Sequence, residues 1–303
     1  MKSQLIALLF LAAPLLLPAQ STETVAIPGS EVSFQLTHIP AGTLVWEDKD
    51  ELQLDAFWIG VHEVTHDEFV LFQHRENDTD ATLRETSGYS ADAVSRPTPP
   101  YLDYTYGMGT SGGFPAVSMT QQAALRYCRW LYEKTGAFYR LPTEAEWTFA
   151  CLAGQSWQPG EEELNKYAWS YDNSYEKYHK IGEKAPNPWG LYDMLGNVAE
   201  WTLDHYEKNY LEAIGENRQN PWVEPIRRHS RTVKGGSYDN EPEACNCLAR
   251  EKSQPRWQAR DPQIPKSIWW NTDSPFVGFR IVRPVQQPGP EEIEAFFDKA
   301  IKD

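Results

Sequence analysis

The positions at which helices can begin limit which secondary structure this chain can form. Capping boxes, in which a Thr or Ser N-cap is followed three residues later by Glu or Gln, occur at residues 65–68, 118–121 and 143–146. Each lies directly before a run of apolar residues and predicts a helix there. Residues 32–36 alternate as a strand does, and residues 155–290 contain short strand patterns without a long helical one. The sequence therefore predicts a few short elements joined by long irregular connections.

The first capping box overlaps a motif with a chemical meaning. Residues 62–66 read HEVTH, which matches the H-E-x-x-H pattern that places two histidines of one helix on a zinc ion. If Thr65 is an N-cap, its backbone is extended and His66 is the first helical residue. His62 would then belong to the strand-like segment 52–61, and the two imidazoles would not share a helical face. We interpret the match as coincidental.

The N-terminus has the form of an export signal. Met1-Lys2 is followed by an apolar run from Leu5 to Leu17 and by small residues around Ala19, which together predict a signal peptide over residues 1–19. A buried first helix is the alternative. The run is shorter than the ~20 residues of a membrane span, and no cysteine near Ala19 offers a lipid anchor. We expect a periplasmic or secreted protein without a membrane span in the mature chain.

Charge and cysteine content narrow the remaining classes. The net charge of −15 argues against nucleic acid as a partner, because nucleic acid attracts basic surfaces. The four cysteines are Cys128, Cys151, Cys245 and Cys247. An exported chain can oxidise them, but spacing alone leaves their pairing open. Cys128 falls among apolar positions of the second predicted helix, so we expect it in the core.

Six sequence blocks occur in the order seen in sulfatase-modifying factors. They are Ile39–Thr43 (IPAGT), Glu63–Thr65 (EVT), Arg140–Trp147 (RLPTEAEW), Asn187–Trp201 (NPWGLYDMLGNVAEW), Lys234–Tyr238 (KGGSY) and Gly278–Arg280 (GFR). From about residue 25 to 285 the chain resembles the formylglycine-generating-enzyme family. The resemblance implies one α+β domain related to C-type-lectin-like folds, with much irregular structure. Residues 286–303 would follow it as a helical tail, since residues 290–297 have an amphipathic helical pattern.

The resemblance also implies a copper site, and here the chain departs from it. Active members of the family oxidise a cysteine of a sulfatase peptide, using Cu(I) held by two cysteines that follow Gly-Gly-Ser. Two thiolates are needed because soft sulfur ligands select Cu(I). The first of these positions is Asn240 in this chain, and the second, five residues on, is Cys245. The candidate pocket is Ser237, Asn240, Cys245 and Arg250. Because asparagine supplies no thiolate, we expect no bound copper and no standard copper-dependent activity.

The cysteines near this position can be aligned in a second way. Residues 247–250 (CLAR) look like the family's Cys-Ala-Ala-Arg. In the family, this cysteine pairs with one at the end of the helix that begins in the RLPTEAEW block. The resemblance thus implies a Cys151–Cys247 disulfide, with unpaired thiols as the alternative. In this alignment Cys245 no longer matches a copper ligand cleanly. A reactive Cys245 and a Cys245–Cys247 metal pair remain alternatives.

Tryptophans mark a further departure around the same pocket. Ala199 stands where the family has a tryptophan that walls the active pocket. The segment before the GFR block is longer than usual and carries Trp257, Trp269 and Trp270. These rings either line a remodelled pocket or lie in the core.

The 187–201 block has a separate meaning, because in the family this loop holds a structural calcium ion. The matching positions are Asp193, Gly196, Val198 and Glu200, the middle two through their carbonyl oxygens, and calcium accepts such mixed ligands. A hydrogen-bonded loop without metal is the alternative. The seven histidines form no metal-binding pattern in the sequence, and only His205 falls near this loop.

These observations favour an exported protein of this family that acts as a binding or scaffold protein of the cell envelope. Its partner would be an exported protein or peptide, or another envelope component. The alternatives are an oxidase of altered chemistry, and a formylglycine-generating enzyme with an unusual site acting on an exported protein or metabolite. The incomplete cysteine pair leaves open whether the chain is an enzyme.

Overall fold

The computed structural model describes residues 21–47, 50–74, 103–154, 157–258 and 272–302. The predicted signal peptide, residues 1–19, lies outside these residues, as do Trp269 and Trp270.

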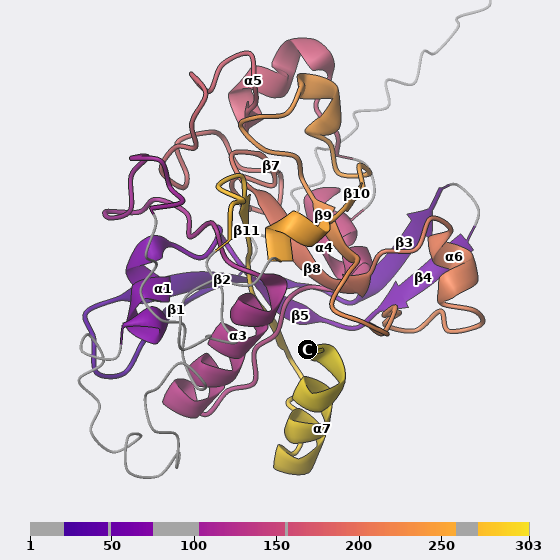
Figure 1. Ribbon diagram of the computed structural model, residues 1–303. Helices are drawn as coiled ribbons and strands as arrows, with labels where there is room; N and C mark the ends of the chain where they lie inside the picture. The colour runs from indigo at the N-terminus through magenta and orange to yellow at the C-terminus, as the bar shows by residue number, and fades with distance from the viewer. Residues whose placement is uncertain (1–20, 48–49, 75–102, 155–156, 259–271, 303) are drawn as a thin grey trace, which may run out of the picture.

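One four-stranded sheet joins the two ends of the chain (Figure 1). Its strands are β1 (Thr22–Ala26), β2 (Ser33–Ile39), β5 (Phe57–Gly60) and β12 (Val282–Pro284), in the order β1-β2-β5-β12, with every neighbouring pair antiparallel. The strand predicted at residues 32–36 is confirmed in β2, where buried and exposed residues alternate over the first half.

The strand-like character predicted for residues 52–61 is confirmed, but the segment is divided between two sheets. The segment forms two strands: β4 (Asp50–Leu54), which pairs with β3 (Gly42–Trp46), and then β5 in the first sheet. The break falls at Asp55, whose backbone N–H donates to Asn220 Oδ1 at 2.8 Å while Asn220 Nδ2 donates to its carboxylate at 2.7 Å. The backbone N–H of Asp55 is thus satisfied by a side chain 165 residues away, so the chain can change sheets there.

The second four-stranded sheet carries the Gly-Gly-Ser loop at one of its strand ends. Its order is β10-β9-β8-β11, built from β8 (Ala199–His205), β9 (Arg231–Lys234), β10 (Glu251–Lys252) and β11 (Val277–Gly278). Only β8 and β11 pair in parallel among these strands. A two-stranded pair, β6 (Ala168–Trp169) with β7 (Leu195–Gly196), precedes β8.

Two of the three predicted capping boxes are confirmed. Thr65 caps α1 (His66–Gln73) and Thr143 caps α4 (Glu144–Cys151), each with its reciprocal Glu contact. The prediction at residues 118–121 is wrong by two residues: α3 (Gln121–Thr135) has Thr120 as its N-cap. Ser118 has φ = 59°, so it lacks the extended backbone of an N-cap, and its hydroxyl donates to the carbonyl of Tyr104.

The remaining helices are short, apart from the terminal helix α7 (Pro290–Ala300), which confirms the amphipathic pattern at residues 290–297. The short ones are the 3-10 turns η2 (Glu161–Glu163), η3 (Pro242–Ala244) and η4 (Pro255–Gln258), and the single-turn helices α5 (Leu164–Tyr167) and α6 (Tyr210–Ala213). The α+β class with much irregular structure is therefore confirmed. Within the described ranges, no helix has both the length and the apolar character needed to span a bilayer.

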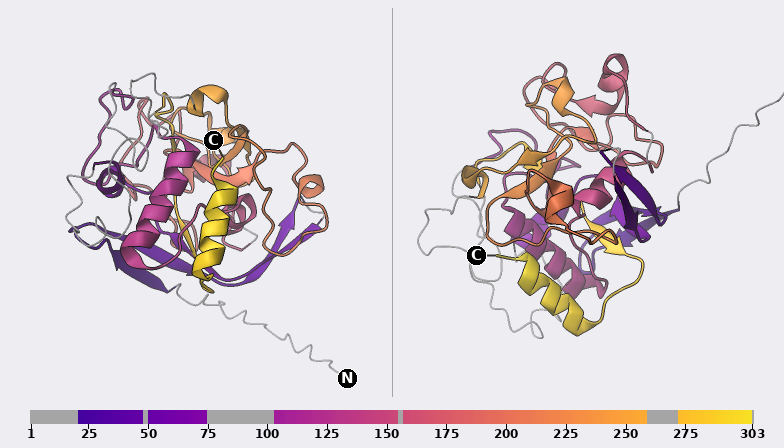
Figure 2. Two further views of the ribbon diagram at one scale, coloured as in Figure 1. Left: turned by 60° about the horizontal axis from the view of Figure 1, so that its bottom comes forward. Right: turned by 90° about the vertical axis from the view of Figure 1, so that its right-hand side faces the viewer.

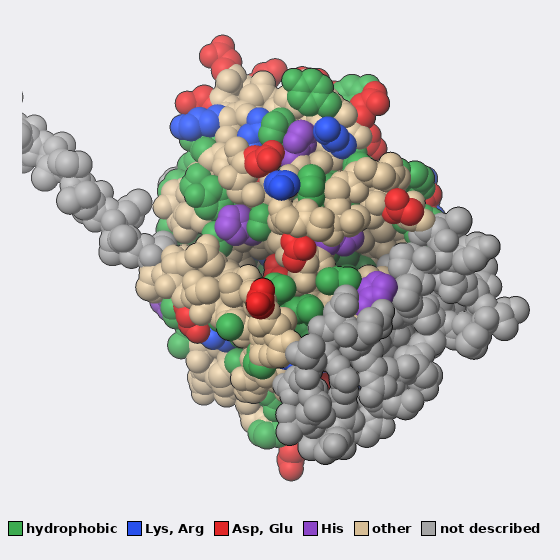
Figure 3. Space-filling view, turned by 90° about the vertical axis from the view of Figure 1, so that its left-hand side faces the viewer, with side chains coloured by type: hydrophobic (Ala, Val, Ile, Leu, Met, Phe, Trp, Pro, Cys, Tyr) green, Lys and Arg blue, Asp and Glu red, His purple; other side chains and the backbone are tan. Residues whose placement is uncertain are grey.

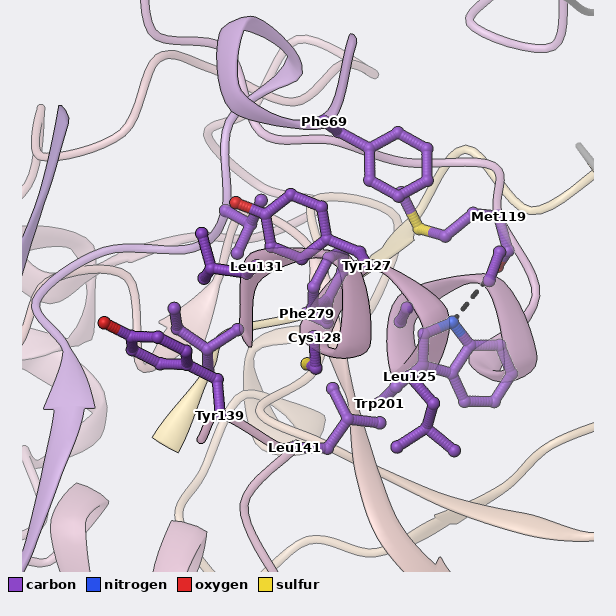
Figure 4. Packing of buried hydrophobic residues seen from close by; sticks show 14 of the residues in the cluster. Phe69, Met119, Leu125, Tyr127, Cys128, Leu131, Tyr139, Leu141, Trp201 and Phe279 are labelled. Carbon is purple, nitrogen blue, oxygen red and sulfur yellow. Dashed lines mark hydrogen bonds between the residues drawn. The ribbon is translucent and has the colours of Figure 1, made fainter. Parts of the chain in front are cut away.

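The main core lies under α3, and α7 runs beside α3 on the same side of the molecule (Figure 2). Phe69, Tyr127 and Phe279 meet edge-on or tilted at centroid distances of 5.5–6.0 Å (Figure 4). Cys128 is buried in this cluster, which confirms its predicted place in the core. Ile293 of α7 belongs to the same cluster, so the terminal helix is attached to the domain by apolar contacts.

Candidate functional site

The Gly-Gly-Ser loop leaves the end of β9 with a backbone that only glycine adopts easily. Gly235 and Gly236 have φ values of 90° and 70°. A Cβ atom on Gly236 would lie 2.9 Å from the carbonyl oxygen of Ala244 and 3.0 Å from the sulfur of Cys245. The two glycines therefore let the loop pass directly against the segment that carries Cys245.

The structure brings Ser237, Asn240 and Cys245 together. The Asn240 Oδ1 atom accepts hydrogen bonds from the Ser237 backbone N–H at 2.9 Å and from the Ser237 hydroxyl at 2.8 Å. The Cys245 thiol donates to the Ser237 carbonyl oxygen at 3.7 Å. The side chain at the first copper position is thus the acceptor that holds the turn closed, a role an amide performs well.

A pocket of about 280 Å³ opens beside this turn. Its lining includes Asn240, Arg250 and Ala199, the residue that replaces the family's tryptophan. The volume is close to the lower limit of small-molecule sites, so it suits one side chain or a small metabolite.

Arg250 lines this pocket, but its guanidinium is committed elsewhere. It forms a two-point ion pair with Glu144, a buried carboxylate at the start of α4, and the Nη2–Oε2 distance is 3.0 Å. It also donates to the carbonyl oxygens of Glu207 at 2.9 Å and Lys208 at 3.2 Å. With these partners satisfied, Arg250 ties α4 to the segment after β8 and acts as a structural residue.

The thiols of this region do not fit Cu(I). Cys247 forms a disulfide with Cys151, with the Cα atoms 5.6 Å apart, which confirms the predicted pairing and removes Cys247 as a metal ligand. Cys245 is 1% exposed, and its burial raises the pKa of the thiol to about 12. A protonated thiol beside an amide is not the pair of thiolates that Cu(I) requires.

The HEVTH residues point in different directions, as expected for a coincidental match. His66 is the first residue of α1, whereas His62 lies before the cap and stacks on Tyr192 with ring centroids 4.8 Å apart. Glu63 is buried and accepts hydrogen bonds from Asn197 Nδ2 at 3.0 Å and from the Val198 backbone N–H at 3.2 Å. On the side of the molecule where α1 lies, the visible histidines are separate from one another (Figure 3). Among the described residues, no three His, Cys, Asp or Glu side chains are placed to hold a metal ion.

The residues that the family resemblance implies as calcium ligands lie in a buried cluster of charged side chains. Asp193 Oδ2 accepts from the Gly182 backbone N–H at 2.7 Å, while its Oδ1 is buried and has no hydrogen-bond partner among the described residues. Glu200 is bound by the guanidinium of Arg280 at 2.6–2.9 Å and by the indole N–H of Trp147 at 2.8 Å. The Asp193 half of the implied site thus has a free oxygen, whereas the Glu200 carboxylate is already occupied.

Glu63 completes this cluster, a role that the sequence did not reveal. Three buried carboxylates, Glu63, Asp193 and Glu200, face the buried guanidinium of Arg280. Burial, together with the charge of Asp193, raises the pKa of Glu63 well above its ordinary value, and burial raises the pKa of Asp193 to about 6. The one signal in the sequence was the EVT block, whose partners lie about 130 residues further along the chain.

Of the three tryptophans before the GFR block, the structure describes Trp257. Trp257 is 2% exposed and packs against Trp201 and Phe276, so it belongs to the core and does not line the pocket. Trp269 and Trp270 lie outside the described residues.

The fold and the Gly-Gly-Ser loop define a class of protein that comparison with known families identifies. The family described as "Sulfatase-modifying factor enzyme 1-like domain" matches residues 16–285, and the chain belongs to this family.

Curated relatives carry more than one kind of name. The chain is 26% identical over 248 residues to "Serine/threonine-protein kinase pkn1" of Chlamydia pneumoniae, a match that covers 77% of this chain and 36% of that protein. It is 30% identical over 160 residues to "Formylglycine-generating enzyme" of Mus musculus, covering 46% of this chain and 40% of that enzyme. The chain therefore spans well under half the length of these relatives. The solved structure of "Treponema denticola variable protein 1" matches with a TM-score of 0.60 and 22% identity, covering 87% of this chain and 99% of that one, and supports the fold.

Proposed function

We propose that this chain is an exported binding protein that uses the sulfatase-modifying-factor fold without copper-dependent formylglycine generation. The observation that carries the proposal is the side chain of Asn240, which stands at the first copper position and holds the Ser237 turn by two hydrogen bonds of 2.8 and 2.9 Å. The proposed partner of the chain is a segment of another exported protein, or a component of the cell envelope.

The state of the remaining thiols supports the same proposal. Cys245 is protonated at neutral pH because burial raises its pKa to about 12, so it is neither a nucleophile nor a soft ligand. The Cys151–Cys247 disulfide favours an oxidising compartment, in agreement with the export signal expected at residues 1–19. The pocket of about 280 Å³ beside Asn240 would receive one side chain of the partner.

The experiment compares the wild-type protein with Asn240→Cys and Asn240→Ser. The two new side chains are of similar size and differ only in having sulfur or oxygen at the same position. Each is incubated with Cu(I), oxygen and a peptide containing a sulfatase-type cysteine, and the peptide is analysed by mass spectrometry for conversion of the cysteine CH2–SH group to an aldehyde. We expect no conversion by the wild type or by Asn240→Ser. Conversion by the wild-type protein with stoichiometric Cu(I) would refute the proposal.

A second measurement tests the binding role directly. Asn240→Trp fills the pocket mouth with a large ring, whereas Asn240→Ser leaves it open. If the pocket receives a partner segment, the protein retained from an envelope extract by the wild type is lost with Asn240→Trp and kept with Asn240→Ser. An identical set of retained proteins for all three would exclude the pocket as the binding site.

The alternative enzyme function is favoured by one observation, the replacement of the wall tryptophan by Ala199, which lines the pocket. An oxidase of altered chemistry would need a redox metal. Metal analysis after reconstitution with copper and with iron distinguishes the two functions. An oxidase should hold about one copper or iron ion per chain, and a binding protein should hold neither.

We also propose a structural calcium ion next to Asp193. Three buried carboxylates against one guanidinium leave an excess negative charge, and Asp193 Oδ1 is a free ligand oxygen. A cation there would add the carbonyl oxygens of Gly196 and Val198, with Glu200 contributing only if it shares its oxygens with Arg280. The test is thermal unfolding in EDTA and in calcium. A calcium-dependent rise in Tm that is lost in Asp193→Ala supports the site, and equal Tm values in the two conditions would remove it.

A further inference from the structure

A second, larger groove lies near the pocket beside Asn240: Arg250 lines that pocket and donates to the carbonyl oxygens of Glu207 and Lys208, which line the groove. It has a volume of about 1040 Å³ and is formed by the end of β8, helix α6 and the segment 222–226. In Figure 1, α6 lies beside the β3–β4 hairpin, and the right-hand view of Figure 2 looks onto this side. The hairpin is held there by Trp46, whose ring stacks on Tyr210 of α6 at a centroid distance of 4.4 Å.

The rim of this groove is acidic. Its lining includes four carboxylate side chains and, among the described residues, one basic side chain, Lys208; the carboxylates are Glu47, Glu207, Glu212 and Glu224. Lys299 pairs with Glu224 at 3.2 Å from outside the lining, but both side chains are more than half exposed, so this pair is weak. Within this lining, carboxylates therefore outnumber basic side chains, while Arg227, Arg231 and Lys252 lie close enough to act electrostatically on His205.

The floor of the groove is apolar and partly uncovered. Trp222 and Ile214 line it, and Ile226 at its edge is 76% exposed. A large aliphatic side chain is rarely left so exposed next to other apolar groups unless another surface covers it. An apolar floor with a charged rim is also the arrangement found at the centre of protein interfaces.

A buried histidine belongs to the lining of this groove. His205 lines the groove and is 2% exposed, yet its Nδ1 atom has no hydrogen-bond partner among the described residues. Its Nε2 lies 3.8 Å from Glu207. A buried ring nitrogen without a partner costs free energy, so the fold holds His205 in this lining against an energetic cost.

The groove is also held rigidly from below. The Arg250 guanidinium donates to the carbonyl oxygens of Glu207 and Lys208, and Asn209 caps α6 by accepting from the Glu212 backbone N–H at 3.3 Å. A pre-formed surface of this kind loses little entropy when a partner docks.

From this placement of an acidic rim around an apolar floor, we propose that the groove docks a basic peptide segment of a partner protein. The segment carries Arg or Lys side chains that meet the rim carboxylates and an aliphatic side chain that covers Ile226. This site is separate from the Asn240 pocket and does not depend on the function proposed for it.

The experiment measures fluorescence anisotropy with the labelled peptide Gly-Arg-Leu-Arg-Gly-Arg-Leu-Arg-Gly. Two control peptides replace every Arg by Glu, or every Leu by Gly. The protein variants are Glu212→Lys in the rim and Ile226→Ser at the edge of the floor. The matched control is Glu162→Lys in η2, an exposed charge reversal far from the groove lining. Thermal unfolding of each variant establishes that it is folded.

The expected result is saturable binding of the Arg-Leu peptide that weakens by about tenfold in Glu212→Lys and in Ile226→Ser. Glu162→Lys should change the affinity by less than about twofold. Equal weakening by Glu162→Lys would mean that the peptide responds only to the net charge of the protein. No saturable binding, or equal binding of the peptide without Leu, would overturn the proposal.

Discussion

Replacing Glu68 by Gln is expected to stabilise the protein at neutral and alkaline pH. Glu68 is the third residue of α1 and 5% exposed, and its carboxylate accepts from the Thr65 backbone N–H at 3.0 Å and from the Thr65 hydroxyl at 2.8 Å. Its other oxygen faces the Tyr127 hydroxyl at 3.5 Å. Glutamine has the same shape and keeps an oxygen for Thr65, so the capping box remains.

The magnitude follows from burial. Desolvation raises the pKa of Glu68 from 4.5 to about 7, and a tenfold change in a protonation equilibrium is worth ~1.4 kcal/mol. Keeping this carboxylate ionised in the folded protein therefore costs ~3.4 kcal/mol above pH 7. A negative charge in the first turn of a helix recovers ~0.3–1 kcal/mol. The net gain on changing to Gln is thus about 2.5 kcal/mol, or ~4 °C in Tm for 303 residues.

The gain must depend on pH with a definite sign. Because the folded-state pKa of Glu68 is raised, ionisation costs nothing below about pH 4.5, where the group is protonated both folded and unfolded. The cost grows as pH rises and is complete above about pH 7. Thermal and urea unfolding of both proteins from pH 4 to 8 should show curves that coincide at low pH and separate above it.

Glu146→Gln is the matched control, because it makes the same change at the same position of the second capping box. Here the carboxylate binds the Arg140 guanidinium at 2.6 and 2.8 Å, so its loss leaves a nearly buried cation unpaired. We expect destabilisation of ~3 kcal/mol. If both substitutions lower stability, or if the Glu68 effect does not change with pH, the reasoning about burial at α1 is refuted.

Two further changes test the buried framework. Arg280→Leu removes the one buried cation that, among the described residues, faces Glu63, Asp193 and Glu200, and should lower the unfolding free energy by ~3–5 kcal/mol. Part of the loss should be recovered in acid as the carboxylates become protonated, and a loss under ~1 kcal/mol at pH 7 would contradict the cluster. Replacing both Cys151 and Cys247 by Ser opens a link between residues 96 positions apart and should cost ~2–5 kcal/mol in urea unfolding. Reduction of the wild type should reproduce this cost, and a variant as stable as the oxidised protein would show that the link contributes nothing.

The parts of the fold that could be predicted from the sequence depend on local signals. Thr65 and Thr143 determine helix starts within four residues of themselves, because the cap and its Glu partner contact each other directly. The error at Ser118 has a tertiary cause, since its backbone N–H and hydroxyl bind Ser274 and Tyr104, and these contacts hold it at a positive φ. Local pattern cannot reveal a residue held by distant partners.

The same limit applies to the candidate sites. The Gly-Gly-Ser loop and the disulfide could be inferred because the family resemblance fixes their places along the chain. The cluster of Glu63 with Asp193 and Arg280 could not, because its members come from segments more than 80 residues apart. The acidic groove could not be predicted from the sequence either, since β8, α6 and the segment 222–226 form its lining only when the chain is folded.

The position of β11 and β12 has a consequence for how the protein is made. Residues 277–284 supply an edge strand to each four-stranded sheet, and Arg280 between them closes the charge cluster. Neither sheet has all of its strands until residues 277–284 have been synthesised. Each sheet is therefore expected to form late in folding, because β12 must pair with β5, Val282 opposite Ile59, across most of the sequence of the domain.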